Sequence, residues 1–324
     1  MSVSIDNSDD EMKRLSIVIP CYNEHAAIRP LFERLEAVSK GLEAISLEIV
    51  CVNDGSSDAT LEALREEQCR FPRGDVTIVD LSRNFGKEAA LSAGLEVCEG
   101  DAVVPMDADL QDPPELVPEM LALWMNGAEV VLAKRSDRSS DSWLKRNSAR
   151  FFYRVQNSVS DVEVPSDVGD FRLMDRMVVD VIKALPENRR FMKGLFAWAG
   201  FRTAVLEYNR ERRSVGASTF TAPRLWRLAL EGITSFSLAP LRIASYLGAL
   251  AATISLAYGG WIAFRTAYFG VDVPGYASIF TAVVFLGGLQ LVCLGIIGEY
   301  VGRTYLEAKR RPSFVIRKVY RRDS

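Results

Sequence analysis

Residues 102–115 read AVVPMDADLQDPPE, an apolar run that is followed at once by acidic residues and then by two prolines. Asp107 and Asp109 are separated by one residue, so their side chains point to the same side of an extended chain. Two carboxylates placed in this way can share one hard cation such as Mg²⁺ or Mn²⁺, and Gln111 can add a carbonyl oxygen. The prolines end the strand and favour the start of a helix. The stretch predicts a strand that ends in a metal site, and its alternative is a solvated turn that caps the helix.

The first two hundred residues alternate short apolar runs with helical patterns. Such alternation is typical of an α/β domain with a mainly parallel sheet, in which ligands bind at the carboxyl ends of the strands. Strands are expected at 15–19, 47–52, 76–81, 102–106 and 129–133, and helices at 26–39, 58–68, 87–98 and 114–125.

Polar loops follow three other predicted strands. They read VIPCYNE at 18–24, VNDGSSD at 52–58 and LSRNFGK at 81–87. Asp54 can accept hydrogen bonds from a base or a ribose, and the turn at Gly55 lets the backbone approach a ligand closely. Each loop alone is explained as well by a turn and a helix cap. Together with the acidic stretch, the loops predict one ligand-binding crevice.

The chain changes in character after about residue 221. Residues 224–238 form an amphipathic pattern, which suits either an ordinary surface helix or one that lies in a membrane interface. Residues 243–264 and 273–298 contain no Asp, Glu, Lys or Arg, and each is long enough to cross a bilayer. We expect two transmembrane helices here, and the alternative is a pair of buried core helices.

The distribution of basic residues predicts the orientation of these helices. Eight Lys and Arg residues lie between 303 and 322, whereas the connecting loop 265–272 holds one arginine. The α/β domain and both termini should therefore be cytoplasmic, at the inner (plasma) membrane. The basic tail is expected at anionic lipid headgroups rather than on nucleic acid, since the net charge of the chain is only −3. Residues 313–316 also predict a short strand.

Several classes of protein are disfavoured by what the sequence lacks. The chain has no GxGxxG after its first strand and no GxxxxGK[ST], which argues against dinucleotide-binding and P-loop enzymes. Its five cysteines are scattered without a CxxC pair, so neither disulfides nor a zinc site are expected. His25 is the only histidine, so carboxylates should carry any chemistry. The polar, acidic residues 1–14 are expected to form a disordered leader rather than a signal peptide.

The motifs VIPCYNE, VNDGSSD, SRNFGKEAALSAGL and MDADLQDPPE together resemble those of family 2 glycosyltransferases with the GT-A fold. GDFRLMDR, NRRFMKGLFAWAGF and SFSLAPLR resemble the polyprenyl-phosphate branch, which includes dolichyl-phosphate mannose synthase and bacterial polyprenyl-phosphate glucosyltransferases. The resemblance implies an α/β GT-A nucleotide-diphospho-sugar transferase domain with interface helices and two C-terminal transmembrane helices. The expected parts are the leader at 1–14, the catalytic domain at 15–220, interface helices at 221–242, transmembrane helices at 243–298 and the tail at 299–324.

The resemblance also implies roles for individual residues. The catalytic residues would be Asp170 and Asp109, and the metal, Mg²⁺ or Mn²⁺, would be held by Asp107, Asp109 and Gln111. The nucleotide-binding residues would be Pro20, Tyr22, Glu24, Asp54, Lys87 and Asp107. The phosphate and acceptor residues would be Arg135, Arg138, Arg146, Arg213 and Ser218. One departure from the family pattern R-x-x-G-x-S-K is Thr219, which replaces the usual lysine.

The implied reaction is the transfer of a hexose from a nucleotide sugar, with UDP-glucose as the leading donor, to polyprenyl (undecaprenyl) phosphate with inversion. The product would be a lipid-linked sugar donor for cell-surface glycan modification. UDP-galactose, UDP-N-acetylglucosamine, an aminoarabinose donor and GDP-mannose remain open as donors. The family also implies a homo-oligomer, with a tetramer as one option. One alternative is a processive polysaccharide synthase, although the chain lacks QxxRW. The other is a non-catalytic membrane scaffold.

Overall fold

The computed structural model describes residues 12–42, 44–135, 168–185, 195–196, 198, 200–208, 239–269 and 275–322. The chain divides into two compact units. The first contains residues 1–154, 162–221 and 312–324 and holds the β-sheet, and the second contains residues 155–161 and 222–311 and holds two long helices.

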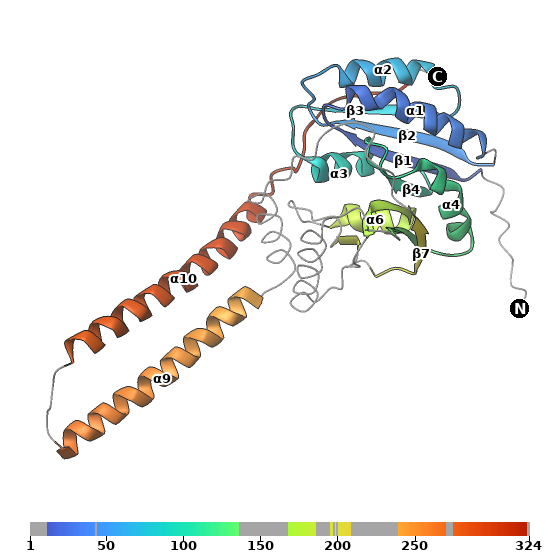
Figure 1. The fold of residues 1–324 in the computed structure, drawn as a ribbon. Helices are drawn as coiled ribbons and strands as arrows, with labels where there is room; N and C mark the ends of the chain where they lie inside the picture. The colour runs from blue at the N-terminus through green and yellow to red at the C-terminus, as the bar shows by residue number, and fades with distance from the viewer. Residues whose placement is uncertain are drawn as a thin grey trace, which may run out of the picture. The chain divides into compact units, whose positions relative to one another are not determined.

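The first unit is built on an eight-stranded mixed sheet in the order β7-β5-β6-β4-β1-β2-β3-β8 (Figure 1). Strands β1 to β4 run parallel to one another, β7 is parallel to β5, and β6 and β8 are antiparallel to their neighbours. The strands are β1 (Arg14–Cys21), β2 (Ser46–Asn53), β3 (Asp75–Leu81), β4 (Ala102–Pro105), β5 (Val130–Arg135), β6 (Val168–Asp175), β7 (Thr203–Tyr208) and β8 (Ile316–Tyr320).

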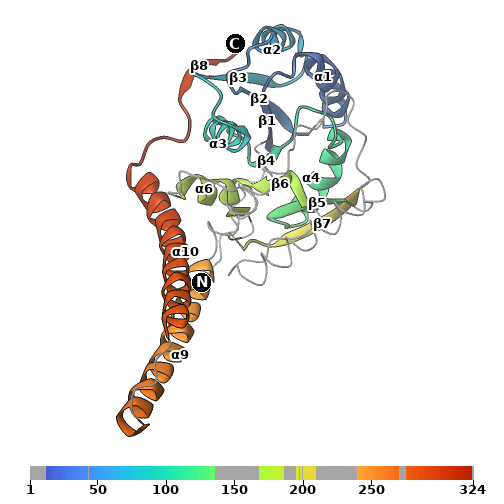
Figure 2. The same ribbon diagram turned by 60° about the vertical axis from the view of Figure 1, so that its left-hand side comes forward.

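Helices cover both faces of this sheet. Figure 2 shows α1 and α4 on one face and α3 and α6 on the other. Since both faces are covered, the central strands β1 and β2 are buried over nearly their whole length. The helices of this unit are α1 (His25–Lys40), α2 (Thr60–Arg70), α3 (Lys87–Val97), η1 (Pro114–Leu116), α4 (Val117–Met125) and α6 (Arg176–Ala184).

Local packing explains how the helices reach the sheet. Ile28, Leu31 and Leu35 lie one helical turn apart on α1, are fully buried and pack in one hydrophobic cluster with Ile17 of β1. On the opposite face, a Cβ atom at Gly94 of α3 would lie 2.3 Å from a methyl group of Val18. Glycine at this position therefore allows α3 to approach the strand closely, and α3 begins beside the ends of β3 and β4.

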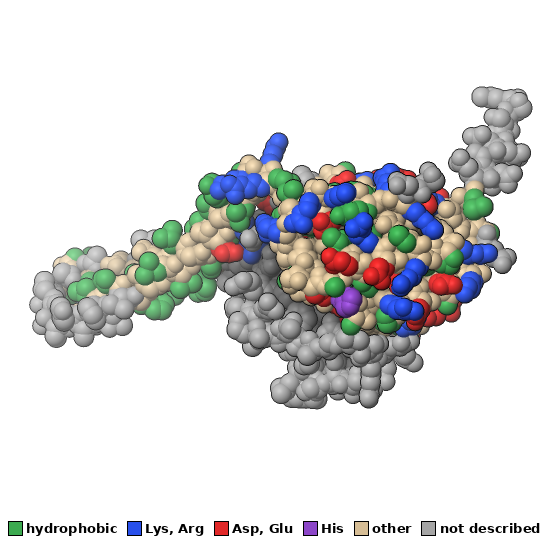
Figure 3. Space-filling model, turned by 90° about the horizontal axis from the view of Figure 1, so that it is seen from above, with side chains coloured by type: hydrophobic (Ala, Val, Ile, Leu, Met, Phe, Trp, Pro, Cys, Tyr) green, Lys and Arg blue, Asp and Glu red, His purple; other side chains and the backbone are tan. Residues whose placement is uncertain are grey.

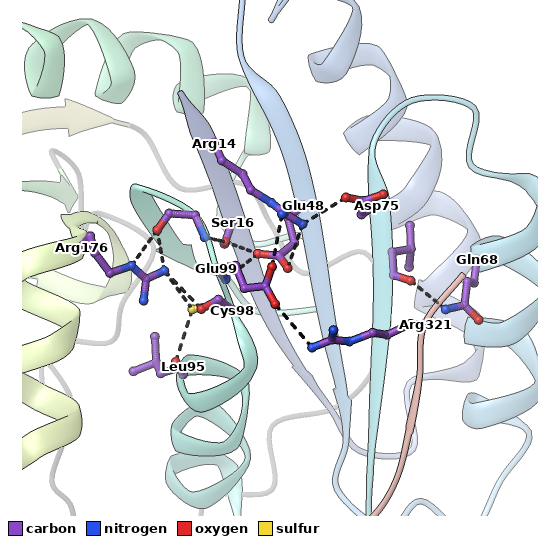
Figure 4. Close-up of polar contacts among 12 residues, drawn as sticks. Arg14, Ser16, Glu48, Gln68, Asp75, Leu95, Cys98, Glu99, Arg176 and Arg321 are labelled. Carbon is purple, nitrogen blue, oxygen red and sulfur yellow. Dashed lines mark hydrogen bonds and ion pairs between the residues drawn. The ribbon is translucent and has the colours of Figure 1, made fainter. Parts of the chain in front are cut away.

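A polar cluster joins the amino ends of the central strands (Figure 4). The Arg14 guanidinium lies 3.3 Å from Glu48 of β2 and 3.0 Å from Asp75 of β3. Glu48 is buried and also accepts hydrogen bonds from the Ser16 hydroxyl and from the Glu99 amide. A buried carboxylate is tolerated when donors surround it in this way. The cluster lies at the amino ends of the strands, opposite the loops that follow their carboxyl ends. It therefore stabilises the sheet away from those loops.

The predicted α/β fold is confirmed, and the expected strands and helices up to residue 133 all form within about two residues of their predicted bounds. Strands β6 and β7 were not predicted. The prediction of a tail strand at 313–316 was wrong in position, because β8 spans Ile316–Tyr320. Backbone pairing with the edge strand β3 sets this register, so the strand includes basic residues rather than following the short apolar run.

In the part of the second unit that the structure describes, the elements are α9 (Ala239–Phe269) and α10 (Tyr276–Ala308). Within them, 244–269 and 285–308 each have a mean hydropathy of 1.5 and are long enough to cross a membrane. Apart from Ala244, the side chains that the structure describes in these two stretches are exposed or half-buried, which is unlike the core helices of a soluble domain. Figure 3 shows apolar side chains along the visible surface of the long helices. Residues 224–238, expected to be amphipathic, lie outside the described residues.

Candidate functional site

The loops after β1 and β2 are joined by direct hydrogen bonds. The Asn23 amide donates to the Ser56 hydroxyl at 3.0 Å, and the Ser57 amide donates to the Asn23 side-chain oxygen at 2.9 Å. Asn23 has a φ of 54°, a left-handed conformation that asparagine tolerates better than most residues. The Glu24 amide donates to Thr60 Oγ1 at 2.9 Å. The two loops therefore form one continuous, hydrogen-bonded wall, and the crevice expected beside it stays a prediction.

Asp54 joins this wall to the loop after β3. Its two carboxylate oxygens accept hydrogen bonds from the Phe85 amide at 2.7 Å and the Gly86 amide at 2.9 Å. Burial raises the pKa of Asp54, while these two amides lower it. Gly55 has a φ of +62°, and a Cβ atom there would lie 2.4 Å from the Arg83 carbonyl carbon. Only glycine fits where the two loops approach each other this closely. A contact between Asp54 and a nucleoside stays a prediction.

An acidic centre lies beside these loops and brings together residues from three elements. The Lys87 ammonium, at the start of α3, lies 2.6 Å from an Asp107 oxygen after β4 and 2.7 Å from Asp170 Oδ2 in β6. Burial would lower the pKa of Lys87, but the two carboxylates raise it above its usual value. Burial raises the pKa of Asp107, although Lys87 opposes this effect. Three residues expected at the site are therefore in direct contact.

The segment 106–112, here called the acidic loop, is held in an unusual conformation. Leu110 has a φ of 57°, which is strained for a leucine and turns the chain sharply after Asp109. Asp109 is 8% exposed, and its Oδ1 accepts a hydrogen bond from the Gln111 amide at 3.1 Å. Asp112 is buried and accepts a hydrogen bond from the Tyr208 hydroxyl at 2.5 Å. The strained loop is therefore anchored to β7 through a residue that the sequence did not single out.

The residues of the acidic centre fit a divalent cation in donor chemistry. Asp107 and Asp170 of this centre, and Asp109 of the acidic loop, carry hard carboxylate oxygens, which Mg²⁺ and Mn²⁺ prefer. Among the residues that the structure describes, no three His, Cys, Asp or Glu side chains are already gathered at metal-binding distances. Asp107 is instead hydrogen-bonded to the Lys87 ammonium. A cation bound at Asp107 would therefore compete with this ammonium for the same carboxylate.

The remaining predicted residues are distributed around this centre or lie outside the described parts of the chain. Pro20 lies near the carboxyl end of β1, and Tyr22 follows that strand with 47% of its surface exposed. The backbone of Arg135 ends β5, where it is in register with Tyr208, but its side chain is outside the described residues. Arg138, Arg146, Arg213, Ser218 and Thr219 are also outside them.

Arg172 is a buried residue near the site that sequence reasoning missed. It lies two residues after Asp170 on the same strand, so both side chains are on one face of the sheet. Its Nη2 donates to the Gly169 carbonyl at 2.8 Å, and its guanidinium carbon lies 4.1 Å from the centre of the Phe196 ring. Burial lowers the pKa of Arg172 to about 10, against the opposing effect of Asp170. Arg172 lies within the motif GDFRLMDR, which could have drawn attention to it. The periodicity of that stretch alone did not show that this arginine is buried.

Comparisons with known proteins give two matches to family profiles. A profile described as glycosyl transferase family 2 matches residues 16–182, and one described as the GtrB C-terminal hairpin matches residues 239–304. The chain is 50% identical to an uncharacterized glycosyltransferase of Synechocystis over 93% of this chain and 94% of that protein. It is 48% identical to an SfII prophage-derived bactoprenol glucosyl transferase of Shigella flexneri over 95% and 99% of the two chains.

Other similarities are to an Escherichia coli protein and to a solved structure. The chain is 46% identical to the prophage bactoprenol glucosyl transferase homolog of E. coli, over 94% of this chain and 99% of that one. Glucosyl-3-phosphoglycerate synthase of Mycobacterium tuberculosis, solved with Mn²⁺, UDP-glucose and phosphoglyceric acid, is 18% identical. The match covers 69% of this chain and 79% of that one, with a TM-score of 0.49.

Proposed function

The chain belongs to glycosyltransferase family 2, and we propose that it transfers a hexose from a nucleotide sugar to a polyprenyl phosphate. Two relatives that match over more than nine-tenths of both chains are named for glucosyl transfer to bactoprenol or as homologs of such enzymes. The match to the GtrB C-terminal hairpin and the two long apolar helices support an acceptor that resides in a membrane. UDP-glucose is the proposed donor and undecaprenyl phosphate the proposed acceptor.

The observation that carries this proposal is the convergence of Asp107, Lys87 and Asp170 at the ends of three elements. The wall formed by the loops after β1, β2 and β3 lies beside them. A site of this kind offers hydrogen-bonding groups for a nucleoside and a charged centre for its diphosphate. The scaffold alternative offers no reason for a buried acidic loop in a strained conformation.

We assign the metal to Asp107, Asp109 and Gln111, with Mg²⁺ and Mn²⁺ both compatible with these donors. When bound, a divalent cation offsets the negative charge that develops on the leaving diphosphate. Lys87, which contacts Asp107, supplies a second positive charge beside the metal. The remaining nucleotide contacts are assigned to Pro20, Tyr22, Glu24 and Asp54.

Attack by the acceptor phosphate on the opposite face of the sugar inverts its configuration. A phosphate monoester has a second pKa near ~6 and is largely ionised at neutral pH, so it needs little help from a base. Asp170 therefore serves chiefly to orient the acceptor, with Asp109 at the metal. Arg135, Arg138, Arg146, Arg213 and Ser218 are proposed to bind the phosphates, since arginine forks bind phosphate oxygens in pairs.

In this proposal the two spans hold the acceptor's lipid tail in the bilayer while its phosphate stays at the surface. The parts of the chain are the catalytic domain at 15–220, interface helices at 221–242, spans at 243–298 and the tail at 299–324. The catalytic domain and both termini are placed in the cytoplasm, and the protein is proposed to act as a homo-oligomer. The charge and hydropathy patterns of the sequence support the proposed parts and orientation, and the family alone supports the proposed homo-oligomer.

The test is the formation of lipid-linked sugar by the full-length protein in detergent. Undecaprenyl phosphate, Mg²⁺ or Mn²⁺ and a panel of labelled nucleotide sugars are supplied to the wild type, to Asp109→Ala and to Glu119→Ala. Glu119 is an exposed acid on α4, so its variant is a matched control for the loss of a carboxylate. We expect a one-sugar product from one donor, lost with EDTA and with Asp109→Ala but kept with Glu119→Ala.

Two other results would change the assignment. A polymer of many sugars would favour the processive synthase. The absence of product from every donor, in protein whose thermal unfolding shows it to be folded, would favour the scaffold alternative.

A further inference from the structure

The chain returns after α10 to add the last strand of the sheet. Strand β8 pairs antiparallel with β3, and Val319 is in register with Val79. The register shifts between Asp80 and Leu81, at the carboxyl end of β3. The tail therefore lies against the strand that leads directly into the loop 82–86, which holds Asp54.

The tail forms hydrogen bonds with both the backbone amide and the backbone carbonyl of Ser82, the first residue of that loop. The Ser82 amide donates to the Val315 carbonyl at 2.9 Å, and Arg317 Nη2 donates to the Ser82 carbonyl at 2.8 Å. Three residues further on, the same loop supplies the Phe85 and Gly86 amides that bind the Asp54 carboxylate. The start of the loop and its far end are thus fixed by two different partners.

A second route leads from the same arginine to the loop after β2. Arg317 Nη1 lies 3.5 Å from Asp80 Oδ2, and Asp80 is 2% exposed. The other Asp80 oxygen accepts a hydrogen bond from Asn53 Nδ2 at 2.7 Å, and Asn53 Oδ1 accepts one from the Ser56 amide at 3.3 Å. Because a buried carboxylate is costly without compensating partners, Arg317 and Asn53 together hold Asp80 in place.

Both sets of contacts from Arg317 lead to loops that touch each other, because the loop at 53–57 packs directly on the backbone of the loop at 82–86. The approach at Gly55 leaves no space even for a methyl group. A shift in either loop must therefore displace the other.

We infer that Arg317 is a positioning residue for the donor site, through which the C-terminal strand holds the two nucleotide-binding loops in place. This inference rests on the proposed function, in which these loops bind the nucleotide. The planar guanidinium serves the Asp80 carboxylate and the Ser82 carbonyl at once, a geometry that a lysine ammonium reproduces only in part. The tail arginines next to it also bind protein groups: Arg321 lies 3.4 Å from Glu99, and Arg322 donates to the Phe71 carbonyl at 2.7 Å.

The test compares full-length Arg317→Ala, Arg317→Lys and Arg321→Ala in detergent. Arg321 is a matched control, since it is about as exposed as Arg317 (65% against 60%) but pairs with Glu99 at the other end of the strands. The first readout is hydrogen exchange at the Ser56, Phe85 and Gly86 amides. The second is binding of UDP and GDP by calorimetry, followed by donor and acceptor KM.

We expect Arg317→Ala to speed exchange at these amides and to raise the nucleotide Kd and donor KM roughly 5- to 30-fold, the range of a loss of one to two kcal/mol. The acceptor KM and kcat should change less than twofold. Arg317→Lys should recover part of the loss, and Arg321→Ala should behave as the wild type.

Three results would overturn the inference. Unchanged exchange in Arg317→Ala would show that the arginine does not position the loops. Faster exchange with unchanged nucleotide affinity would show that this positioning does not serve the donor site. Equal loss of binding to phosphatidylglycerol vesicles in Arg317→Ala and Arg321→Ala, with normal nucleotide affinity, would show that the tail arginines bind lipid instead.

The wild type distinguishes failure of this inference from failure of the proposed function. If wild-type protein binds neither UDP nor GDP, the proposed function fails as well. If wild-type binding is normal, only the role of Arg317 is refuted.

Discussion

Replacing Lys87 by methionine should make the protein bind Mn²⁺ more tightly while it becomes a poorer transferase. Methionine keeps an apolar stem of similar length and removes the ammonium that contacts Asp107 and Asp170. Charge-assisted hydrogen bonds are worth about 1.5–3 kcal/mol each when they are buried. The Lys87 side chain is 44% exposed, so screening by solvent reduces the two contacts to about 1–2 kcal/mol in total.

This energy opposes binding of the cation, since a metal at Asp107 competes with the ammonium for the carboxylate and is repelled by its positive charge. Without the ammonium, the Kd for Mn²⁺ should fall by roughly 5- to 30-fold. The donor KM should rise in the same variant, because the diphosphate loses a positive charge. Opposite changes in metal and donor affinity are the expected result for a cation that competes with the metal but attracts the diphosphate.

The assay is a titration of full-length protein with Mn²⁺ in the absence of nucleotide, with free Mn²⁺ measured by electron paramagnetic resonance. Lys40→Met is the control, because Lys40 forms a surface ion pair with Glu36 on α1, away from the acidic centre. Its Kd for Mn²⁺ should equal that of the wild type. Equal or weaker Mn²⁺ binding by Lys87→Met would refute the competition between the ammonium and the metal.

Three further changes test the loops and their supports. Gly55→Ala should raise donor KM by about tenfold or more, because backbone strain of ~1–3 kcal/mol is added where there is no space for a methyl group. The control is Gly127→Ala, which is also at positive φ but in open space and should leave donor KM unchanged. Tyr208→Phe leaves a buried carboxylate of the acidic loop one donor short, so unfolding should become easier by ~1–3 kcal/mol, and an unaltered thermal midpoint would contradict this. The Arg34 guanidinium lowers the pKa of Glu115, so this pair stabilises the fold above pH 4.5 and the stabilisation is lost as Glu115 is protonated. Glu115→Gln should therefore lower stability by ~0.5 kcal/mol at neutral pH, and the difference from wild type should shrink as the pH falls below 4.5.

The local elements could be predicted from the sequence, whereas the metal-binding role of the acidic loop stays a prediction. Apolar runs and helical periodicity are properties of neighbouring residues, so β1 to β5 and α1 to α4 were placed closely. The two uncharged stretches predicted the long apolar helices for the same reason. The spacing of Asp107 and Asp109 carried the metal prediction, although both residues lie in the loop after β4 and not on the strand.

Only the tertiary structure decided which distant residues meet. Lys87 contacts Asp170 across 83 positions, Tyr208 contacts Asp112 across 96, and Arg317 contacts Asp80 across 237. Each contact depends on the order of strands in the sheet, in which β6 lies beside β4 and β8 beside β3. Strand order is set by the packing of whole elements and not by any local pattern. For that reason the sequence proposed Lys87 as a member of the site but did not predict its position between Asp107 and Asp170, nor the tail strand that contacts the loop after β3.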